Sequence, residues 1–271
     1  MPASIALITG GASGIGAAFA RSLASRGYDI IVVDRSREGA EALAKELAGR
    51  YSIKVDFVEA DLANEADLKR VQAYIAQLEA LDLLINNAGF GTTGNFVATN
   101  FDRQIDMISV HVLAAVRFCR AALPAMIARG AGSIINICSI NAFLRFPETA
   151  TYSATKAYLL VFSECLEAEL AGTGVKVQAL CPGQTYTNFT TTPDMQGFDP
   201  GRIPPFLWMS ADELVNRSLA ALELGSGRFI PAWKNHLFVF VFGNRFILKV
   251  LAFLRKYGVL ELVLKALKKR R

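Results

Sequence analysis

Residues 9–16 read Thr-Gly-Gly-Ala-Ser-Gly-Ile-Gly and follow a short apolar run at 4–9. A helical pattern begins within them and continues to about residue 26. Glycines at a strand–turn–helix junction let the backbone approach a pyrophosphate, whose charge the free amides of the helix N-terminus can meet. A tight turn with glycines needed only for packing is the alternative. The setting favours a dinucleotide site with these candidate contacts: Thr9, Gly10, Ser13, Gly14, Ile15 and Gly16.

The same alternation of apolar strands and helix-length segments continues along the chain. Strand patterns occur at 28–33, 53–59, 82–86, 133–138 and 175–180, and helical patterns at 38–49, 65–79, 101–129 and 152–171. A capping box, Ser210-Ala-Asp-Glu213, opens another helix that ends near residue 224, before a short strand at 228–230. Strands separated by helices pair in parallel through right-handed crossovers. We therefore predict an α/β fold, a doubly wound parallel sheet of the Rossmann type.

Length and composition predict one main domain, followed by a C-terminal helical extension. The chain has 271 residues, of which 52% are hydrophobic and 20% are charged, so it can bury a large core. We place the domain at 1–232 and the tail at 233–271. Residues 183–209 form a long irregular stretch, and loops of that length in a compact domain usually serve as binding lids.

Cysteine usage and the N-terminus bear on the compartment. The cysteines are scattered singly in apolar surroundings, at Cys119, Cys138, Cys165 and Cys181. Their spacing fits neither a metal site nor a disulfide framework, so we expect no bound metal and a reducing, cytoplasmic compartment. Residues 1–9 lead directly into a strand pattern, so we also expect no cleaved leader.

Charge is unevenly distributed along the chain. The net charge of +5 combines a net of −5 over residues 1–227 with a net of +10 over residues 228–271, where Glu261 is the only acid. Because the main body is net negative, the overall positive charge is no sign that the main body binds nucleic acid. Any binding of an anionic partner is therefore expected at the basic tail.

The tail has an apolar part and a basic part. Its longest uncharged run, 235–244, is too short to span a bilayer. Beyond it, basic residues recur at helical spacing against apolar ones over 245–256 and 259–271, which predicts two amphipathic helices. Residues 236–271 could lie on an anionic membrane surface. Packing against a sister subunit or an extension of the substrate pocket are the alternatives.

Acidic residues end two of the predicted strands. Asp34 can accept hydrogen bonds from both ribose hydroxyls and would repel a 2′-phosphate, which favours NAD. Arg35 argues for NADP because a guanidinium could pair with that phosphate. We weight Asp34 more heavily, since no basic residue occupies the glycine turn. Asp61-Leu62 could contact adenine, although a helix cap is an alternative role for Asp61.

Two adjacent asparagines end the strand at 82–86. Asn86 and Asn87 would be costly if buried without partners, so we expect them to tie neighbouring strands together by hydrogen bonds. Ala88 and Gly89 follow and are small enough to let the chain pass close to an adenosine ribose.

A possible acid/base group lies further along the chain. If 152–171 is helical, Tyr152 and Lys156 share one face. A free tyrosine has a pKa of ~10, and a cation beside it favours the phenolate and brings the phenol into a useful range for proton transfer. The hydroxyl of Ser139, thirteen residues before Tyr152, could hydrogen-bond a substrate carbonyl or alcohol. Tyr-x-x-x-Lys alone also occurs by chance on amphipathic helices.

In these motifs and their order the chain resembles the short-chain dehydrogenase/reductase family in its single-domain form. The resemblance covers residues 3–230 and rests on 9–16, 86–89, Ser139, Tyr152-x-x-x-Lys156 and Pro182-Gly183-Gln184-Thr185. It implies a nicotinamide cofactor, NAD or else NADP, and hydride transfer to or from a carbonyl carbon.

The resemblance also implies roles for single residues. Tyr152 would be the general acid/base, Lys156 would lower its pKa and bind the nicotinamide ribose, and Ser139 would hold the substrate oxygen. Pro182 and Gly183 would flank the nicotinamide, with Thr185 near its carboxamide.

One position departs from the family pattern. The family usually has an asparagine midway along the helix that corresponds to 101–129, where it helps to hold a water in a proton relay with the lysine. Here that position is His111. An imidazole could support a similar relay and could titrate near neutrality. Alternatively, His111 is a packed helix residue and the relay runs through backbone and water.

Three stretches should border the substrate end of the pocket. They are Phe90-Gly91, residues 141–146, and the lid aromatics Tyr186, Phe189, Phe198, Phe206 and Trp208. Many aromatics and few charges favour a bulky apolar substrate. The alternative is that these aromatics only pack the lid onto the body or onto another subunit.

The leading interpretation is therefore an oxidoreductase that transfers a hydride between NAD(H) and a bulky apolar alcohol or ketone, in a homo-oligomer. Alternatives are an NADP(H)-dependent carbonyl reductase, another reaction on the same scaffold, and a non-catalytic nucleotide-sensing protein. A sensor would not need Ser139, Tyr152 and Lys156 together.

Overall fold

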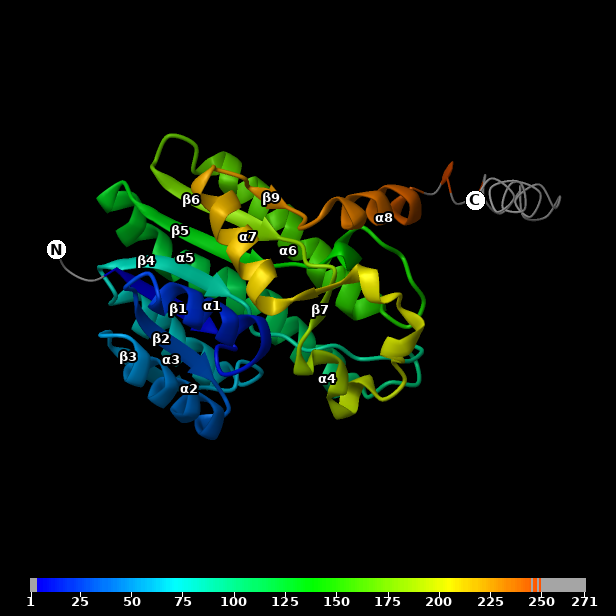
Figure 1. Cartoon of the computed structure of the whole chain (residues 1–271), viewed down its shortest axis with the longest axis horizontal. Coiled ribbons are helices and arrows are strands. Elements are labelled where there is room, and N and C mark those ends of the chain that lie inside the picture. Colours follow the sequence, from blue (N-terminus) through cyan, green and yellow to red (C-terminus); the bar gives the residue numbers. More distant parts are fainter. Residues whose placement is uncertain (1–3, 245, 248, 250–271) are drawn as a thin grey trace. The chain divides into compact units, whose positions relative to one another are not determined.

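The computed structural model describes residues 4–244, 246–247 and 249 (Figure 1). The chain divides into two compact units, Met1–Pro231 and Ala232–Arg271.

The first unit is built on one sheet of seven parallel strands. In spatial order these are β3 (Val55–Glu59), β2 (Asp29–Asp34), β1 (Ile5–Thr9), β4 (Leu81–Asn86), β5 (Gly132–Ile137), β6 (Val175–Leu180) and β9 (Arg228–Phe229). The strands run as buried apolar sequences because helices cover both faces of the sheet. The chain proceeds from β1 outward through β2 and β3, and then returns to continue on the other side through β4. This confirms the predicted doubly wound α/β fold and creates a crevice where the strand order reverses.

Helices form a layer on each face of this sheet (Figure 1). One layer contains α1 (Gly14–Ala24), α2 (Arg37–Arg50) and α7 (Ala211–Glu223), and the other contains α3 (Glu65–Ala76), α5 (Ala114–Arg129) and α6 (Ala150–Glu169). The hydroxyl of Ser210 accepts a hydrogen bond from the Glu213 amide (3.1 Å), as the capping box predicted. Phe19 and Phe118 are fully buried, one in the core of each layer.

The helix predicted at 101–129 is continuous but not regular. It consists of α4 (Phe101–Ile108), a π-helical turn (Ser109–Leu113) and α5. Within the described part of the chain, Phe101–Arg129 is the one helix whose length and composition would suit a membrane span. Its buried residues Phe118 and Met126 belong to the core beneath the sheet, which is the usual position of an apolar helix in an α/β domain.

The lid segment 183–209 has more regular structure than predicted. Its ends form a two-stranded parallel sheet, β7 (Gln184–Tyr186) with β8 (Trp208–Ser210). Short 3₁₀ turns lie between them, among them Asn188–Thr191 and Pro193–Met195. The pairing of β7 with β8 holds the two ends of the lid together.

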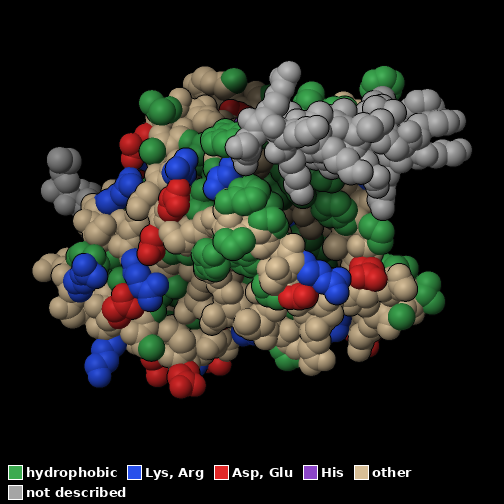
Figure 2. Space-filling view, turned by 45° about the vertical axis from the view of Figure 1, so that its right-hand side comes forward, with side chains coloured by type: hydrophobic (Ala, Val, Ile, Leu, Met, Phe, Trp, Pro, Cys, Tyr) green, Lys and Arg blue, Asp and Glu red, His purple; other side chains and the backbone are tan. Residues whose placement is uncertain are grey.

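Surface charges in the first unit are mixed in sign. Figure 2 shows Lys and Arg side chains interspersed with Asp and Glu on the face that it draws. Arg21 of α1 pairs with Glu46 of α2 at 2.7 Å, for example. Three of the cysteines, Cys119, Cys138 and Cys181, are buried as predicted. Cys165 of α6 is exposed, so the prediction that it lies in apolar surroundings is wrong.

The second unit begins with α8 (Trp233–Gly243), a helix within the tail that was predicted to be helical over 233–271. It covers most of the uncharged stretch 235–244. The two amphipathic helices predicted over 245–256 and 259–271 lie outside the described residues, apart from 246–247 and 249.

Candidate active site

The glycine turn follows β1 and leads into α1. Gly10 has φ 63°, and a Cβ added there would lie 2.8 Å from the Cα of Ala88. A Cβ on Gly16 would lie 2.2 Å from the carbonyl oxygen of Gly10. Any side chain at these positions would push the turn away from β4 and α1. Ser13 precedes α1 without capping it through its side chain, so the first amides of the helix are left for a ligand.

The asparagine motif ties the glycine turn to β4. The Asn87 side-chain amide donates to the carbonyl oxygens of Thr9 and Gly10, both at 2.9 Å. Thr9 Oγ1 accepts from the backbone amides of Asn87 and Ala88, both at 3.0 Å. Asn86, the last residue of β4, donates to Asn136 of the neighbouring strand β5 at 2.8 Å. These bonds confirm the predicted structural role of the asparagines, and they fix the edge of the crevice between β1 and β4.

Asp34 lies at the end of β2, beside the glycine turn. One of its carboxylate oxygens accepts from the Ala12 amide and the other from the Ser36 amide, each at 3.0 Å. The carboxylate is therefore held in place at the edge of the crevice, with lone pairs left on each oxygen. Arg35 is exposed next to it.

Asp61 follows β3 and does not cap a helix. The N-cap of α3 is Asn64, whose side chain accepts from the amides of Ala66 and Asp67. The alternative reading of Asp61 as a cap is therefore wrong. Its side chain instead accepts from Ala63 at 3.0 Å in the turn between β3 and α3.

One continuous cavity of about 430 Å³ runs along the carboxyl ends of the strands. Most of the predicted site residues line it: Gly10, Ser13, Gly14, Ile15, Asp34, Arg35, Asp61, Leu62, Asn87, Ala88, Gly89, Ser139, Tyr152, Lys156, Pro182, Gly183 and Thr185. Thr9, Gly16 and His111 do not line it. They lie behind the lining, where Thr9 and Gly16 shape the glycine turn.

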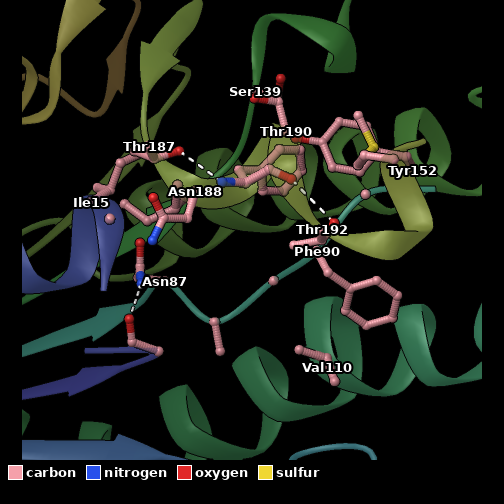
Figure 3. Close-up of a pocket in the computed structure, with 18 of the residues that line it drawn as sticks. Ile15, Asn87, Phe90, Val110, Ser139, Tyr152, Thr187, Asn188, Thr190 and Thr192 are labelled. Carbon is pink, nitrogen blue, oxygen red and sulfur yellow. Dashed lines mark hydrogen bonds between the residues drawn. The ribbon is translucent and has the colours of Figure 1, made fainter. Parts of the chain in front are cut away.

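Tyr152, Lys156 and Ser139 all line this cavity. Figure 3 shows Tyr152 and Ser139 among its lining side chains. Tyr152 and Lys156 are one turn apart near the start of α6, as predicted, and the Lys156 ammonium lies 5.8 Å from the centroid of the Tyr152 ring. Lys156 is almost fully buried and donates to the carbonyl oxygen of Ile137 at 2.8 Å. Ser139 follows β5, and its hydroxyl is close enough to the Tyr152 phenol to lower the pKa of that group.

Burial dominates the electrostatics of this group. It raises the pKa of Tyr152 to about 12, and the nearby Ser139 hydroxyl offsets only part of that rise. Burial also lowers the pKa of Lys156 to about 8. From the sequence we expected the lysine to lower the pKa of the phenol, but in this structure the loss of solvation raises that pKa instead. Both side chains therefore favour their neutral forms more than in water, which suits groups that exchange protons near neutral pH.

The lid closes the substrate end of the cavity. Phe189 lies over Tyr152, with ring centroids 5.9 Å apart. A Cβ on Gly91 would lie 2.7 Å from Met195 Sδ and 2.9 Å from the Phe189 ring, so only glycine lets the lid approach the loop after β4 this closely. Phe90 and Phe198 complete an apolar wall. The lid also contributes Thr187, Asn188, Thr190 and Thr192, which were not predicted (Figure 3).

Several predicted lid aromatics do not line the cavity. Tyr186 and Trp208 stack on each other at 4.9 Å across the β7–β8 pair, with Tyr186 exposed. Phe206 and Phe146 are exposed. Tyr186 and Trp208 therefore pack on each other within the lid, which is neither the predicted pocket wall nor the predicted contact with the body. Alternating side chains of a strand point to opposite faces, and the sequence did not reveal which face the lid presents to the cavity.

Arg103 of α4 lines the cavity and binds the lid, and it was not predicted as a site residue. Its guanidinium lies 4.1 Å from the centroid of the Phe90 ring and pairs with Asp194 of the lid (2.7 Å) and with Asp106 (2.9 Å). These carboxylates raise the pKa of Arg103. No local pattern predicts the contact with the lid, because Arg103 and Asp194 lie 91 residues apart.

Comparison with known proteins agrees with this geometry. The family model described as short chain dehydrogenase matches residues 4–196, and the chain belongs to this family. Hydroxysteroid dehydrogenase-like protein 1 of Gallus gallus is 32% identical over 247 residues, which cover 89% of this chain and 71% of that protein.

Two solved structures are similar over most of the chain. The short-chain dehydrogenase from Sphingobium yanoikuyae in complex with NADPH has a TM-score of 0.79 and 33% identity, covering 85% of this chain and 88% of that one. The bulky-bulky ketone specific alcohol dehydrogenase from Comamonas testosteroni has a TM-score of 0.76 and 32% identity, covering 84% and 86%. The protein is accordingly an NAD(P)-dependent oxidoreductase, and its glycine turn, free helix amides and held carboxylate fit such a cofactor.

Proposed function

We propose that this enzyme transfers a hydride between NAD(H) and a bulky apolar alcohol or ketone. The observation that carries the proposal is the position of the Tyr152 phenol. It lies beside Ser139 at the end of a cavity whose far part is the dinucleotide crevice and whose near wall is Phe90, Phe189 and Phe198.

The proposed roles follow from these positions. In the reductive direction Ser139 donates a hydrogen bond to the substrate carbonyl oxygen, and the Tyr152 O–H bond breaks as its proton passes to that oxygen. The nicotinamide, when bound, supplies the hydride that forms the new C–H bond. Lys156 stabilises the resulting phenolate and binds the nicotinamide ribose, while Pro182, Gly183 and Thr185 border the ring. Oxidation of an alcohol reverses each step.

The substrate class is proposed from the wall. The rings of Phe90, Phe189 and Phe198 and the thioether of Met195 line the near end, which favours an apolar molecule that presents its carbonyl to Tyr152. The similarity to a dehydrogenase described as specific for bulky-bulky ketones supports the same class.

The cofactor preference is proposed from Asp34. Its fixed carboxylate can accept from ribose hydroxyls and would repel a 2′-phosphate. Arg35 and the NADPH complex of the Sphingobium enzyme support the alternative, an NADP(H)-dependent carbonyl reductase.

We expect competition kinetics over a series of ketones of increasing bulk to give a higher kcat/KM with NAD(H) than with NADP(H), and a higher value for bulky aryl ketones than for acetone. Asp34→Ala should shift the cofactor ratio toward NADP(H) by at least about tenfold, because it removes the repulsion. The exposed Asp56, replaced by alanine, is the matched control and should leave the ratio unchanged. A wild-type preference for NADP(H) would show that Arg35 dominates.

The non-catalytic alternative is disfavoured because Ser139, Tyr152 and Lys156 lie together at the cavity. Self-association is proposed from the exposed apolar residues Phe101 and Ile105 on α4 and Tyr158 and Val161 on α6. For the compartment, cytoplasmic remains the proposal, with membrane contact through the tail.

The membrane proposal rests on α8 and the sequence after it. Trp233, Leu237 and Phe240 are more than half exposed. Residues 232–271 carry ten Lys+Arg and one acid, Glu261. The eleven-residue helix is ~16 Å long, against ~30 Å for a bilayer core, so it would lie in the interface rather than span it.

Truncation after Ala232 should abolish sedimentation with anionic vesicles, and salt should release the intact protein. Neutral vesicles of the same size are the control. If intact protein does not bind anionic vesicles at low salt, the membrane role is excluded. A change in oligomer mass on truncation would assign the tail to a subunit contact instead.

A further inference from the structure

His111 lies in the π-helical turn between α4 and α5, and it is 1% exposed. Its Nε2 accepts a hydrogen bond from the backbone amide of Phe90 at 3.1 Å. A neutral imidazole that accepts at Nε2 carries its proton on Nδ1. Nδ1 lies 2.9 Å from Thr155 Oγ1 and therefore donates to it.

The two partners of His111 belong to the two sides of the active site. Phe90 is part of the substrate wall, and Arg103 covers the face of its ring. Thr155 stands between Tyr152 and Lys156 on α6, and its hydroxyl donates in turn to the Tyr152 carbonyl oxygen at 2.9 Å. His111 also contacts both aromatic rings, with centroid distances of 5.9 Å to Phe90 and 5.8 Å to Tyr152.

We propose that His111 is a neutral positioning residue that holds the substrate wall at Phe90 and the catalytic turn of α6 at a fixed separation, and that it carries no proton in the reaction. Both ring nitrogens are already used by protein groups, so a relay through the ring would first have to break one of these bonds. This inference deepens the proposed function, on which its catalytic consequence rests.

The surroundings favour the neutral ring. Burial lowers the pKa of His111 well below its usual value, and the Lys156 charge lowers it further. The two titratable groups that face the ring are Lys156 and Tyr152, and neither is an acid that would stabilise an imidazolium. A Cβ on Gly89 would lie 2.8 Å from Nε2, so a glycine before Phe90 is what makes room for the ring.

An asparagine could make only half of these contacts. Its amide group lies where Nδ1 of histidine lies, within reach of Thr155, but it is one bond too short to reach the Phe90 amide. A glutamine amide lies near Nε2, within reach of Phe90 but not in place to bond Thr155. His111→Asn therefore removes the contact with the Phe90 amide, and His111→Gln removes the contact with Thr155.

The tautomer can be measured without any turnover. The chain has two histidines, His111 and His236, so imidazole ¹⁵N spectra contain two ring systems, and His236→Gln identifies them. We expect the His111 ring to stay neutral with its proton on Nδ1 from about pH 8 down to about pH 5. Titration of His111 in that window, or a proton on Nε2, would overturn the proposal even if the enzyme acts on another substrate.

Kinetics then separate positioning from proton transfer. With a bulky ketone, His111→Asn should raise KM roughly tenfold with less than threefold loss of kcat, because the buried Phe90 amide loses its acceptor. His111→Gln should lower kcat roughly tenfold with little change in KM. Thr155→Val should lower kcat by a similar factor, and the double variant His111→Gln/Thr155→Val should lose no more kcat than either single variant.

Equal losses of kcat in both His111 variants, with KM unchanged, would assign proton transfer to the imidazole and overturn the proposal. Wild-type kinetics in both would overturn it as well. Wild-type protein inactive on every ketone would count against the proposed function alone, since the tautomer measurement stands apart from it.

Discussion

The Tyr152→Phe enzyme is expected to turn over ketones at least about 100-fold more slowly than wild type while binding the cofactor with nearly unchanged affinity. The substitution removes the hydroxyl that exchanges a proton with the substrate oxygen, and keeps the ring that packs against Phe189 and His111. Steady-state kcat and a direct titration of reduced cofactor check the two halves of the expectation.

Tyr158→Phe is the matched control, because Tyr158 lies on the same helix, is 47% exposed and does not line the cavity. It should retain wild-type kcat. A Tyr152→Phe enzyme within threefold of wild type would remove Tyr152 from its proposed role.

Lys156→Met is expected to damage both rate and cofactor affinity, by about tenfold or more each. Methionine fills much of the same volume, so the change removes the buried ammonium and its bond to Ile137 with limited repacking. Lys176→Met is the control, since that lysine lies outside the cavity and bonds the end of α7. Full cofactor affinity in Lys156→Met would argue against the ribose contact.

The same lysine predicts a pH dependence. The pKa of Lys156 is lowered to about 8, so the ammonium is present below that pH and is lost as the pH rises through it. The kcat/KM for ketone reduction should therefore fall above about pH 8, and this limb should be missing from the residual activity of Lys156→Met.

The strands, helices and strand-end motifs could be predicted because their signals are local. β-branched runs, helical spacing and the Ser210 capping box each depend on nearby residues, and parallel strands bring their carboxyl ends to one edge. Seventeen of the predicted residues consequently line one cavity.

The features that could not be predicted from the sequence depend on contacts between distant segments of the chain. The Arg103–Asp194 pair, the β7–β8 pairing and the approach of Phe189 to Gly91 each join parts of the chain that no local pattern relates. The pKa of Tyr152 was expected to fall beside Lys156, yet it rises, because the extent of burial is a property of the closed lid and is not encoded in the spacing of the two residues.

The most direct test of the central claim is the fate of the transferred hydrogen. With NADH deuterated at the reactive nicotinamide position and a bulky aryl ketone, mass spectrometry of the alcohol should show one deuterium on the former carbonyl carbon, formed by wild type and not detectably by Tyr152→Phe. Tight binding of NADH without deuterium in the alcohol from any ketone of the series, or equal labelling by both proteins, would contradict the account.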